Sequence, residues 1–285
     1  LNSSGVMTQY AVGTLDRSSG TTTVTDIYGN ADAIIGRWTN GQTAGTAAYT
    51  LSANQGFHYF FNRPISVAFS LPTSGQINYN LIASTKPTIA DGSLAPGVFE
   101  ARMAFLFGSS IRVAMEGNIT MPTSGSNSVF NFSTQGGMAN PSQTTTGVFH
   151  STGAFQYSVS ATQSTGPCGS SGCSVDFNGT FTGNNTNTIG MTYTAQNGDI
   201  NKTLIGAALF GAQTTPAPAI PAPASAPAMA DSNWARWDAP TTANAVPLPS
   251  LDTPAASLPG SVTSTESQRS MAEALLGGKI RFDNK

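Results

Sequence analysis

Hydrophobic and polar residues alternate with a period of two along much of the chain before residue 212. The clearest run is VFEARMAFLFG, residues 98–108, in which apolar side chains occupy every second position and Glu100 and Arg102 lie between them. The segment that begins at Ile111 has the same alternation. A period of two is typical of a β-strand with one buried face. The pattern therefore predicts two neighbouring antiparallel strands.

The loop between these two runs fixes their predicted register. Gly108, Ser109 and Ser110 form a loop of odd length, which brings residue 107 opposite residue 111 and keeps the apolar residues of both strands on one face. Arg102 then lies opposite Glu116 on the other face. Such an opposite-charge pair across two strands contributes about 0.2–1 kcal/mol.

Segments with the same alternation recur at short intervals, and turn sequences such as Asn40-Gly41 and Asn197-Gly198 separate them. The segments are residues 6–15, 33–38, 57–61, 77–83, 153–161, 173–182, 189–195 and 202–211. Helical periodicity is almost absent before residue 264. We therefore predict an all-β fold, an antiparallel barrel or sandwich of eight or more strands that comprises residues 1–211.

Alternation alone does not show which face of the strands points inward. A barrel in an outer membrane has the same period, with its apolar side chains on the outside. Two features argue against a membrane barrel. The chain ends at Lys285 after a long Pro-rich segment, and its aromatic residues do not gather at strand ends. We expect the apolar face to form the core.

Proline and glycine divide the chain near Ala212. Ten of the 17 prolines follow this residue, whereas 27 of the 30 glycines precede it. Residues 212–263 are rich in Pro and Ala, a composition that favours an extended chain, so we expect a linker or a docking arm. Residues 264–285 predict a short helix, which opens at the capping box Ser270–Glu273, and then a strand-like segment.

Charged residues make up only 9% of the 285 residues, against about 25% in an ordinary soluble domain. The net charge is −2 and the chain has no basic cluster, which argues against binding of nucleic acid. No run of about 18 apolar residues occurs, so no transmembrane helix is predicted. The polar surface is expected to consist mainly of the 32 serines and 36 threonines.

The two cysteines, Cys168 and Cys173, lie close together in a Gly/Ser-rich segment. Their spacing suits one small disulfide formed in an oxidising compartment, and two free thiols are the alternative. The sequence begins at Leu1 without an initial Met, a basic segment or an apolar leader. We therefore expect that a signal peptide or an upstream domain has been removed.

Few residues suit catalysis or metal binding. The two histidines, His58 and His150, each lie beside aromatic residues in an expected strand, where a structural role is the simpler interpretation. The chain lacks the motifs of serine hydrolases, zinc peptidases, P-loops and EF-hands. Cys168 and Cys173 supply two sulfur ligands with no His or further Cys nearby. We expect a protein without enzymatic activity, cofactor or metal.

Several segments together point to a known family. They are IIGRWTNG at residues 34–41, NQGFHYF at 54–60, KPTIADGSLAPGVFEARMAFLFG at 86–108, and CSVDFNGTFTGNNTNTIGMTYTA with LIGAALFG at 173–211. In these segments the chain resembles the lipocalin-like β-barrel domain of transferrin-binding protein B type surface proteins, in the version found downstream of FecR-like domains in Gram-negative bacteria. The most specific part is a G-x-F-x-G strand end at residues 179–183 followed by G-x-x-Y at 190–193.

This resemblance implies a barrel whose last strand pairs with its first, and an extracellular or outer-membrane surface location rather than the periplasm. Glycines at 179, 183, 190, 206 and 211 fit sites where strands bend or backbones approach closely. No segment resembles the large ligand-binding handle domains or the FecR-like domain of the family. Capture of transferrin or haem is therefore not implied.

The C-terminal arm contains the strongest candidates for partner docking. Trp234 and Trp237 flank Arg236 in the Pro/Ala-rich segment, where two exposed indoles are unfavourable in water. Ile280 and Phe282 alternate as in a strand that adds to a sheet edge. We predict that these residues dock on a protein partner or on another copy of the chain, in a homo-oligomer or polymer. A loose C-terminus with incidental aromatics is the alternative.

The sequence thus favours a non-enzymatic structural or interaction protein of a Gram-negative cell surface, with possible outer-membrane association. The rival hypothesis is a ligand-binding module in outer-membrane iron or nutrient uptake. A pocket of roughly 300 Å³ or more lined by aromatic residues would favour that rival. A barrel filled with Phe and Met would favour the structural role.

Overall fold

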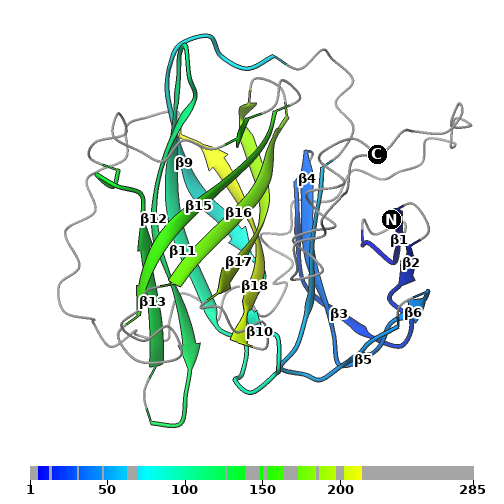
Figure 1. Cartoon of the computed structure of the whole chain (residues 1–285). Helices are drawn as coiled ribbons and strands as arrows, with labels where there is room; N and C mark the ends of the chain where they lie inside the picture. Colours follow the sequence, from blue (N-terminus) through cyan, green and yellow to red (C-terminus); the bar gives the residue numbers. More distant parts are fainter. Residues whose placement is uncertain are drawn as a thin grey trace, which may run out of the picture.

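The computed structural model describes most of the chain up to residue 213 (Figure 1). The described part contains β-strands and no α-helix. It comprises residues 6–12, 15–30, 32–46, 48–62, 70–125, 127–138, 148–149, 153–163, 173–183, 186–196 and 202–213. The all-β class predicted from the alternation is thereby confirmed.

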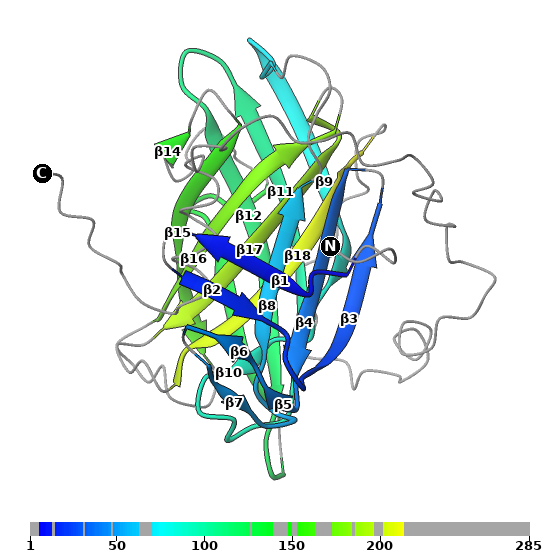
Figure 2. The same cartoon turned by 90° about the vertical axis from the view of Figure 1, so that its right-hand side faces the viewer.

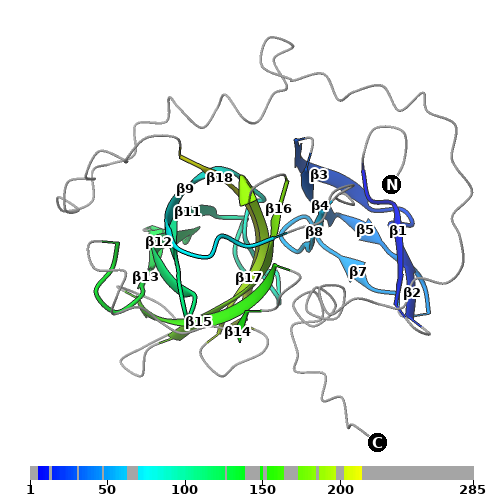
Figure 3. The ribbon, with the colours of Figure 1, turned by 90° about the horizontal axis from the view of Figure 1, so that it is seen from above.

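Eight antiparallel strands close into a barrel, which Figure 3 shows end-on. Each strand pairs with the next along the chain, and β18 returns to pair with β9, so the last strand meets the first as the family resemblance implies. The eight strands are β9 (Gly75–Ser84), β11 (Val98–Phe107), β12 (Arg112–Pro122), β13 (Asn127–Ser133), β15 (Ala154–Gln163), β16 (Cys173–Thr182), β17 (Thr188–Gln196) and β18 (Leu204–Ala212). Two short strands, β10 (Thr88–Ile89) and β14 (Val148–Phe149), pair with β18 and β15.

Apolar side chains point into the barrel and polar ones point out. Along β15, Phe155, Tyr157 and Val159 are buried, whereas the alternating Gln156 and Ser158 are exposed. The same alternation runs along β13. The apolar face of the strands is thus the core, as expected.

The predicted hairpin has the predicted register. Leu106 lies opposite Arg112, which places residue 107 next to residue 111, and Arg102 lies opposite Glu116. Arg102 Nε donates a hydrogen bond of 2.6 Å to Glu116 Oε1 on the outer face. The three-residue loop and the alternation together were sufficient to determine this register.

Residues 6–62 form three small sheets beside the barrel rather than barrel strands (Figures 1 and 2). One contains β3 (Thr23–Gly29), β4 (Ala33–Thr39) and β8 (Phe57–Asn62). The second contains β1 (Gln9–Val12), β2 (Leu15–Ser18) and β6 (Ala44–Gly45), and the third pairs β5 (Gly41–Gln42) with β7 (Thr50–Leu51). A period of two indicates a strand but not the sheet to which the strand belongs, so the sequence pattern did not separate these from the barrel.

The single strand expected over residues 6–15 is wrong. The chain reverses within this segment, so that β1 and β2 form a hairpin in which Val12 lies opposite Leu15. Only Gly13 and Thr14 separate the two strands in the sequence.

The sheet β3-β4-β8 packs against the outside of the barrel at β17 and β18. Ala33, Ile35 and Phe60 from this sheet form one buried cluster with Ala207 and Leu209 of β18. As a result β17 has the barrel core on one face and β8 on the other, and its residues from Thr188 to Ala195 are all buried. All residues of β4 are buried as well.

The predictions made for the C-terminal arm lie outside the described residues. They include the linker at 212–263 beyond residue 213 and the helix and strand-like segment at 264–285. The five docking candidates there are Trp234, Arg236, Trp237, Ile280 and Phe282. Within the described part of the chain, no helix has the length and apolar character needed to cross a membrane.

Candidate functional site

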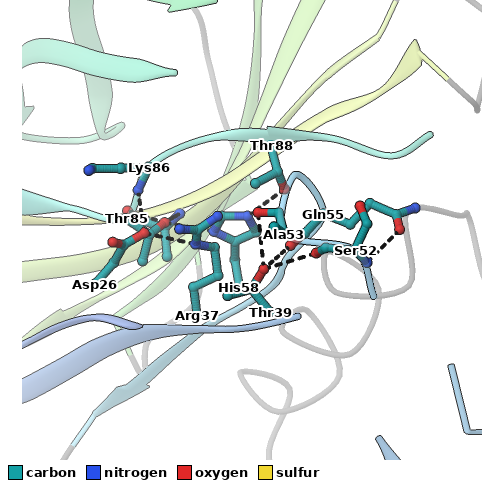
Figure 4. A network of polar contacts seen from close by, with 11 residues as sticks. Asp26, Arg37, Thr39, Ser52, Ala53, Gln55, His58, Thr85, Lys86 and Thr88 are labelled. Atoms are coloured by element: carbon teal, nitrogen blue, oxygen red, sulfur yellow. Dashed lines mark hydrogen bonds and ion pairs between the residues drawn. The ribbon is translucent and has the colours of Figure 1, made fainter. Parts of the chain in front are cut away.

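A network of buried polar residues joins the sheet β3-β4-β8 to the barrel (Figure 4). Neighbouring strands bring together Arg37 and His58, which lie opposite each other in the pairing of β4 and β8. The barrel contributes Thr85, which directly follows β9, and Thr88, the first residue of β10. We call Asp26, Arg37, His58, Thr85 and Thr88 the interface network.

His58 is completely buried between two threonine hydroxyls. Its Nδ1 lies 2.7 Å from Thr85 Oγ1, and its Nε2 lies 2.8 Å from Thr88 Oγ1. Thr85 in turn binds the backbone of β18, because its Oγ1 accepts a 2.9 Å hydrogen bond from the Ala207 N–H. One imidazole thereby connects β8 to two segments of the barrel.

The surroundings of His58 keep its imidazole neutral. Burial, and secondly the positive charge of Arg37, hold the pKa of His58 well below its ordinary value of 6.5. A neutral imidazole has one N–H donor and one acceptor nitrogen, and both nitrogens are used here by threonine. This histidine has no free nitrogen with which to take a proton from a substrate, so the geometry assigns it a structural role.

Arg37 is the second polar group of the interface network. Its Nε lies 2.8 Å from Asp26 Oδ2, and the two side chains are only 6% and 14% exposed. Asp26 lies at an irregularity in the pairing of β3 with β4 and has a positive φ of 52°. The same Oδ2 accepts a 3.0 Å hydrogen bond from the Lys86 N–H. The carboxylate therefore links the arginine of β4 to the backbone of the barrel.

Thr39 and Gln55 extend these contacts toward β10. The Thr39 hydroxyl donates to the carbonyl of Gln55 at 2.6 Å, and the amide of the Gln55 side chain donates to the carbonyl of Ala90 at 2.7 Å. The segment before β8 is therefore bonded to β4, as Figure 4 shows for Thr39, and through Gln55 also to the barrel. Hydrogen bonds of this kind satisfy polar groups that burial would otherwise leave unpaired.

The interior of the barrel is filled with aromatic and methionine side chains. Phe105 is completely buried, with its ring centroid 4.8 Å from that of Phe181 and 5.3 Å from that of Phe155. Phe99 stacks on Tyr193 at 4.3 Å. Further side chains no more than 4% exposed belong to the same core: Tyr79, Met103, Phe107, Met115, Met121, Phe130, Phe132, Tyr157, Phe177, Met191 and Phe210.

A second polar feature lies in the N-terminal sheets, away from the interface network. Arg17 of β2 is completely buried, and its guanidinium carbon lies 3.9 Å from the ring centroid of Tyr49 and 5.6 Å from that of Phe57. Among the described residues, neither Nε nor either Nη of Arg17 has a hydrogen-bond partner. Unlike Arg37, it forms no ion pair within this part of the chain.

The hydroxyl of Tyr10 is also buried and unpartnered within the described residues. Burial raises the pKa of Tyr10, and the positive charge of Arg17 opposes that rise. The Tyr10 ring stacks on Phe57 at 5.4 Å. We call Tyr10, Arg17, Tyr49 and Phe57 the Arg17 cluster. A buried cation without an acceptor costs on the order of several kcal/mol, which the contact with Tyr49 offsets only in part.

The site residues predicted from the sequence are not brought together by the described structure. Cys173 is buried at the start of β16, while Cys168 lies outside the described residues, so their disulfide stays a prediction. His150 also lies outside them, as do the docking candidates of the arm. Within the described residues no group of three or more His, Cys, Asp or Glu side chains is placed to hold a metal ion.

Sequence reasoning did not identify the interface network or the Arg17 cluster. The sequence does contain a signal for the interface network. Arg37 interrupts the apolar run IIGRWT and His58 interrupts FHYFF, and polar residues within such runs are buried and paired. Arg17 has no comparable signal. It lies in the polar segment LDRSS, and its burial involves two aromatic side chains from other segments, Tyr49 and Phe57.

Comparisons with known proteins place the chain in no family. No family model and no curated protein matches it. Among solved structures, it is similar to the crystal structure of the isotype 1 transferrin binding protein B (TbpB) from serogroup B Neisseria meningitidis, with 12% identity and a TM-score of 0.35. The match covers 72% of this chain and 35% of that one, so the chain spans about a third of that protein's length.

Similarity at this level carries no argument about function. The class of the chain rests on its own topology, a closed eight-stranded antiparallel barrel that fits a lipocalin-like fold. To this barrel the sheet β3-β4-β8 adds a second layer over β17 and β18.

Proposed function

We propose that the protein is a non-enzymatic interaction module at the surface of a bacterium or outside the cell. The observation that carries this proposal is the filled interior of the barrel. Lipocalin-like barrels that transport small molecules need a cavity, whereas here rings such as Phe105 and Phe181 pack at 4.8 Å between their centroids. A barrel filled in this way acts through its outer surface and its attached segments.

The interface network supports a scaffold role. The polar atoms of His58 and of the Arg37–Asp26 pair hold the sheet β3-β4-β8 on the barrel. Because this sheet covers β17 and β18, the two parts form one layered body. A rigid body of this kind suits presentation of a binding segment to a partner.

The C-terminal arm is the segment that we propose to bind the partner. It starts at a fixed point, because Ala212 pairs with Tyr79 and the Gln213 N–H donates a 2.8 Å hydrogen bond to the Asn78 carbonyl. Beyond this point the sequence carries Trp234 and Trp237, the two indoles of the arm. Their burial against another copy of the chain is the proposed source of affinity.

Light scattering on the full chain tests this proposal. We expect the wild-type protein to form oligomers in the micromolar range and the double variant Trp234→Ala/Trp237→Ala to be monomeric. Met229→Ala is the matched control, since it removes an apolar side chain from the same Pro/Ala-rich segment without touching an indole. An oligomer that persists in the double variant, or a wild-type chain that stays monomeric and binds no copy of itself, would contradict the proposal.

A further inference from the structure

We propose that the Arg17 cluster binds the carboxylate of an organic ligand with an apolar body. The inference concerns the N-terminal sheets and does not depend on the arm or on the proposed oligomer. It rests on a guanidinium that is completely buried and whose nitrogens have no acceptor among the described residues.

A buried arginine normally faces a carboxylate. Arg37 does so in the sheet β3-β4-β8, where its Nε lies 2.8 Å from Asp26 Oδ2. Arg17 is buried too, but no carboxylate in the described part of the chain pairs with it. Its guanidinium presents a planar set of N–H donors, which matches the two oxygens of a carboxylate. A ligand that supplies these oxygens would satisfy the unpaired donors.

Tyr10 adds a second donor of the right kind. Its hydroxyl is buried and has no partner among the described residues. Tyr10 and Arg17 lie directly opposite each other in the antiparallel pairing of β1 with β2, so their side chains are neighbours on the same face of this sheet. A carboxylate bound by the guanidinium can therefore also accept a hydrogen bond from this phenol.

The aromatic surroundings indicate what the rest of the ligand is like. Tyr10 stacks on Phe57 at 5.4 Å, and Phe57 stacks on Trp38 at 4.9 Å. Such a wall suits a flat apolar group attached to the carboxylate. The shared chemistry can come from a small aromatic acid or from the carboxyl end of a peptide with a terminal aromatic residue.

Tyr49 is the side chain that must move to admit this ligand. Its ring covers the guanidinium at 3.9 Å, yet the residue is 39% exposed, one of two large apolar residues with that much exposure in the described chain. Its backbone is held by Thr43, whose hydroxyl accepts a 2.8 Å hydrogen bond from the Tyr49 N–H. The ring can therefore rotate outward while the backbone stays in place.

Thermal unfolding of the full chain with sodium benzoate tests the inference, with sodium chloride at the same ionic strength as reference. A ligand of the native state alone raises Tm, by about 3–6 °C at ten times Kd for a domain of this size. We expect this rise for the wild-type protein and none for Arg17→Met. Without benzoate we expect Arg17→Met to unfold at the same Tm as the wild type or higher, since it removes an unpaired buried charge.

Two further variants keep the test decisive. Arg17→Lys preserves the charge but not the planar donors, so calorimetric titration should show benzoate binding at least tenfold weaker than for the wild type. Arg102→Met is the matched control, because Arg102 is paired with Glu116 on the barrel, and its response to benzoate should equal that of the wild type. An equal response of the wild type and both Arg17 variants would overturn the proposal.

A second ligand distinguishes the two sources of the carboxylate, a small aromatic acid and the carboxyl end of a peptide. Acetyl-Gly-Gly-Phe with a free carboxyl end, compared with its amide, reports binding of a peptide end. Tighter binding of the acid peptide than of benzoate assigns the site to peptides, and the reverse order assigns it to small acids. A wild-type Tm that rises with inorganic phosphate and with neither carboxylate, or with none of the three, overturns the carboxylate assignment.

Discussion

The ring of Phe60 lies directly on the backbone of Gly190. A Cβ atom at Gly190 would be 1.9 Å from Phe60 Cε2, a separation that real Cβ atoms do not show. Phe60 belongs to β8 of the N-terminal sheet, and Gly190 belongs to β17 of the barrel. The absence of a side chain at this position therefore lets the two layers approach closely.

Gly190→Ala should destabilise the protein. The added methyl group overlaps the Phe60 ring, so the sheet must shift away from the barrel, and overpacking of this kind costs about 1–3 kcal/mol. Denaturant unfolding measures the loss. Gly108→Ala is the control, because the nearest atom to its Cβ is 4.0 Å away, and we expect a change within about 0.5 kcal/mol.

A double-mutant cycle checks the cause. In a Phe60→Ala background the ring is gone, and Gly190→Ala should then cost much less than in the wild type. Equal losses in both backgrounds would show that the strain at Gly190 has another origin than Phe60.

Asp26→Asn should lower the free energy of unfolding more than Glu116→Gln, which breaks the more exposed Arg102–Glu116 pair on the barrel. Asparagine tolerates the positive φ of 52°, so the substitution removes the charge and keeps the backbone. Arg37, with its side chain 6% exposed, then remains buried without its counter-charge, which costs about 3–5 kcal/mol. Urea unfolding at neutral pH gives the free energy of unfolding for comparison with the wild type.

Glu116→Gln is the matched control for Asp26→Asn. It breaks the pair with Arg102, whose side chains are 18% and 34% exposed. Pairs that contact water contribute little, so the expected loss is below about 1 kcal/mol. If the two variants lose similar amounts of free energy of unfolding, the Asp26–Arg37 pair does not hold the sheet β3-β4-β8 on the barrel.

His58 should make the protein less stable in mild acid. The folded pKa lies well below 6.5, so the unfolded chain takes up a proton at His58 that the folded chain does not. This contribution is constant above about pH 6.5 and is lost as the pH falls below it, with a slope that approaches about 1.4 kcal/mol per pH unit. Free energies of unfolding between pH 7.5 and pH 5 measure it.

His58→Gln isolates this effect from all other titrating groups. Glutamine does not titrate, so the stability difference between the wild type and the variant should narrow as the pH falls below 6.5. His150 is common to both proteins and cancels in the difference. Parallel pH profiles would show that His58 is not the group responsible.

The sequence was sufficient for features that depend on local pattern. Alternation and a three-residue loop gave the register that pairs Arg102 with Glu116. The same information could not place residues 6–62, because a short strand signal does not show which sheet the strand joins, and β4 is buried on both of its faces. Burial of Arg17 could not be anticipated either, since it involves Tyr49, which lies 32 residues further along the chain, just before β7.

Phe105→Ala should open a cavity inside the barrel. Phe105 is completely buried, with ring neighbours that include Phe155, Phe181 and, edge-on, Tyr79. Truncation of a phenylalanine in such a core costs about 3–5 kcal/mol, and the space left is apolar. An engineered cavity of this kind stays dry and binds small apolar molecules, so toluene should raise the Tm of the variant.

The wild-type protein is the decisive comparison for this variant, because its Tm should not respond to toluene if the interior is filled as described. Phe105→Leu, which removes less volume, should lose less stability and respond less. A wild-type barrel that is itself stabilised by toluene would show space among Phe105 and its neighbours. The interior would then serve as a ligand site, and the interaction role proposed from its filled core would lose its main support.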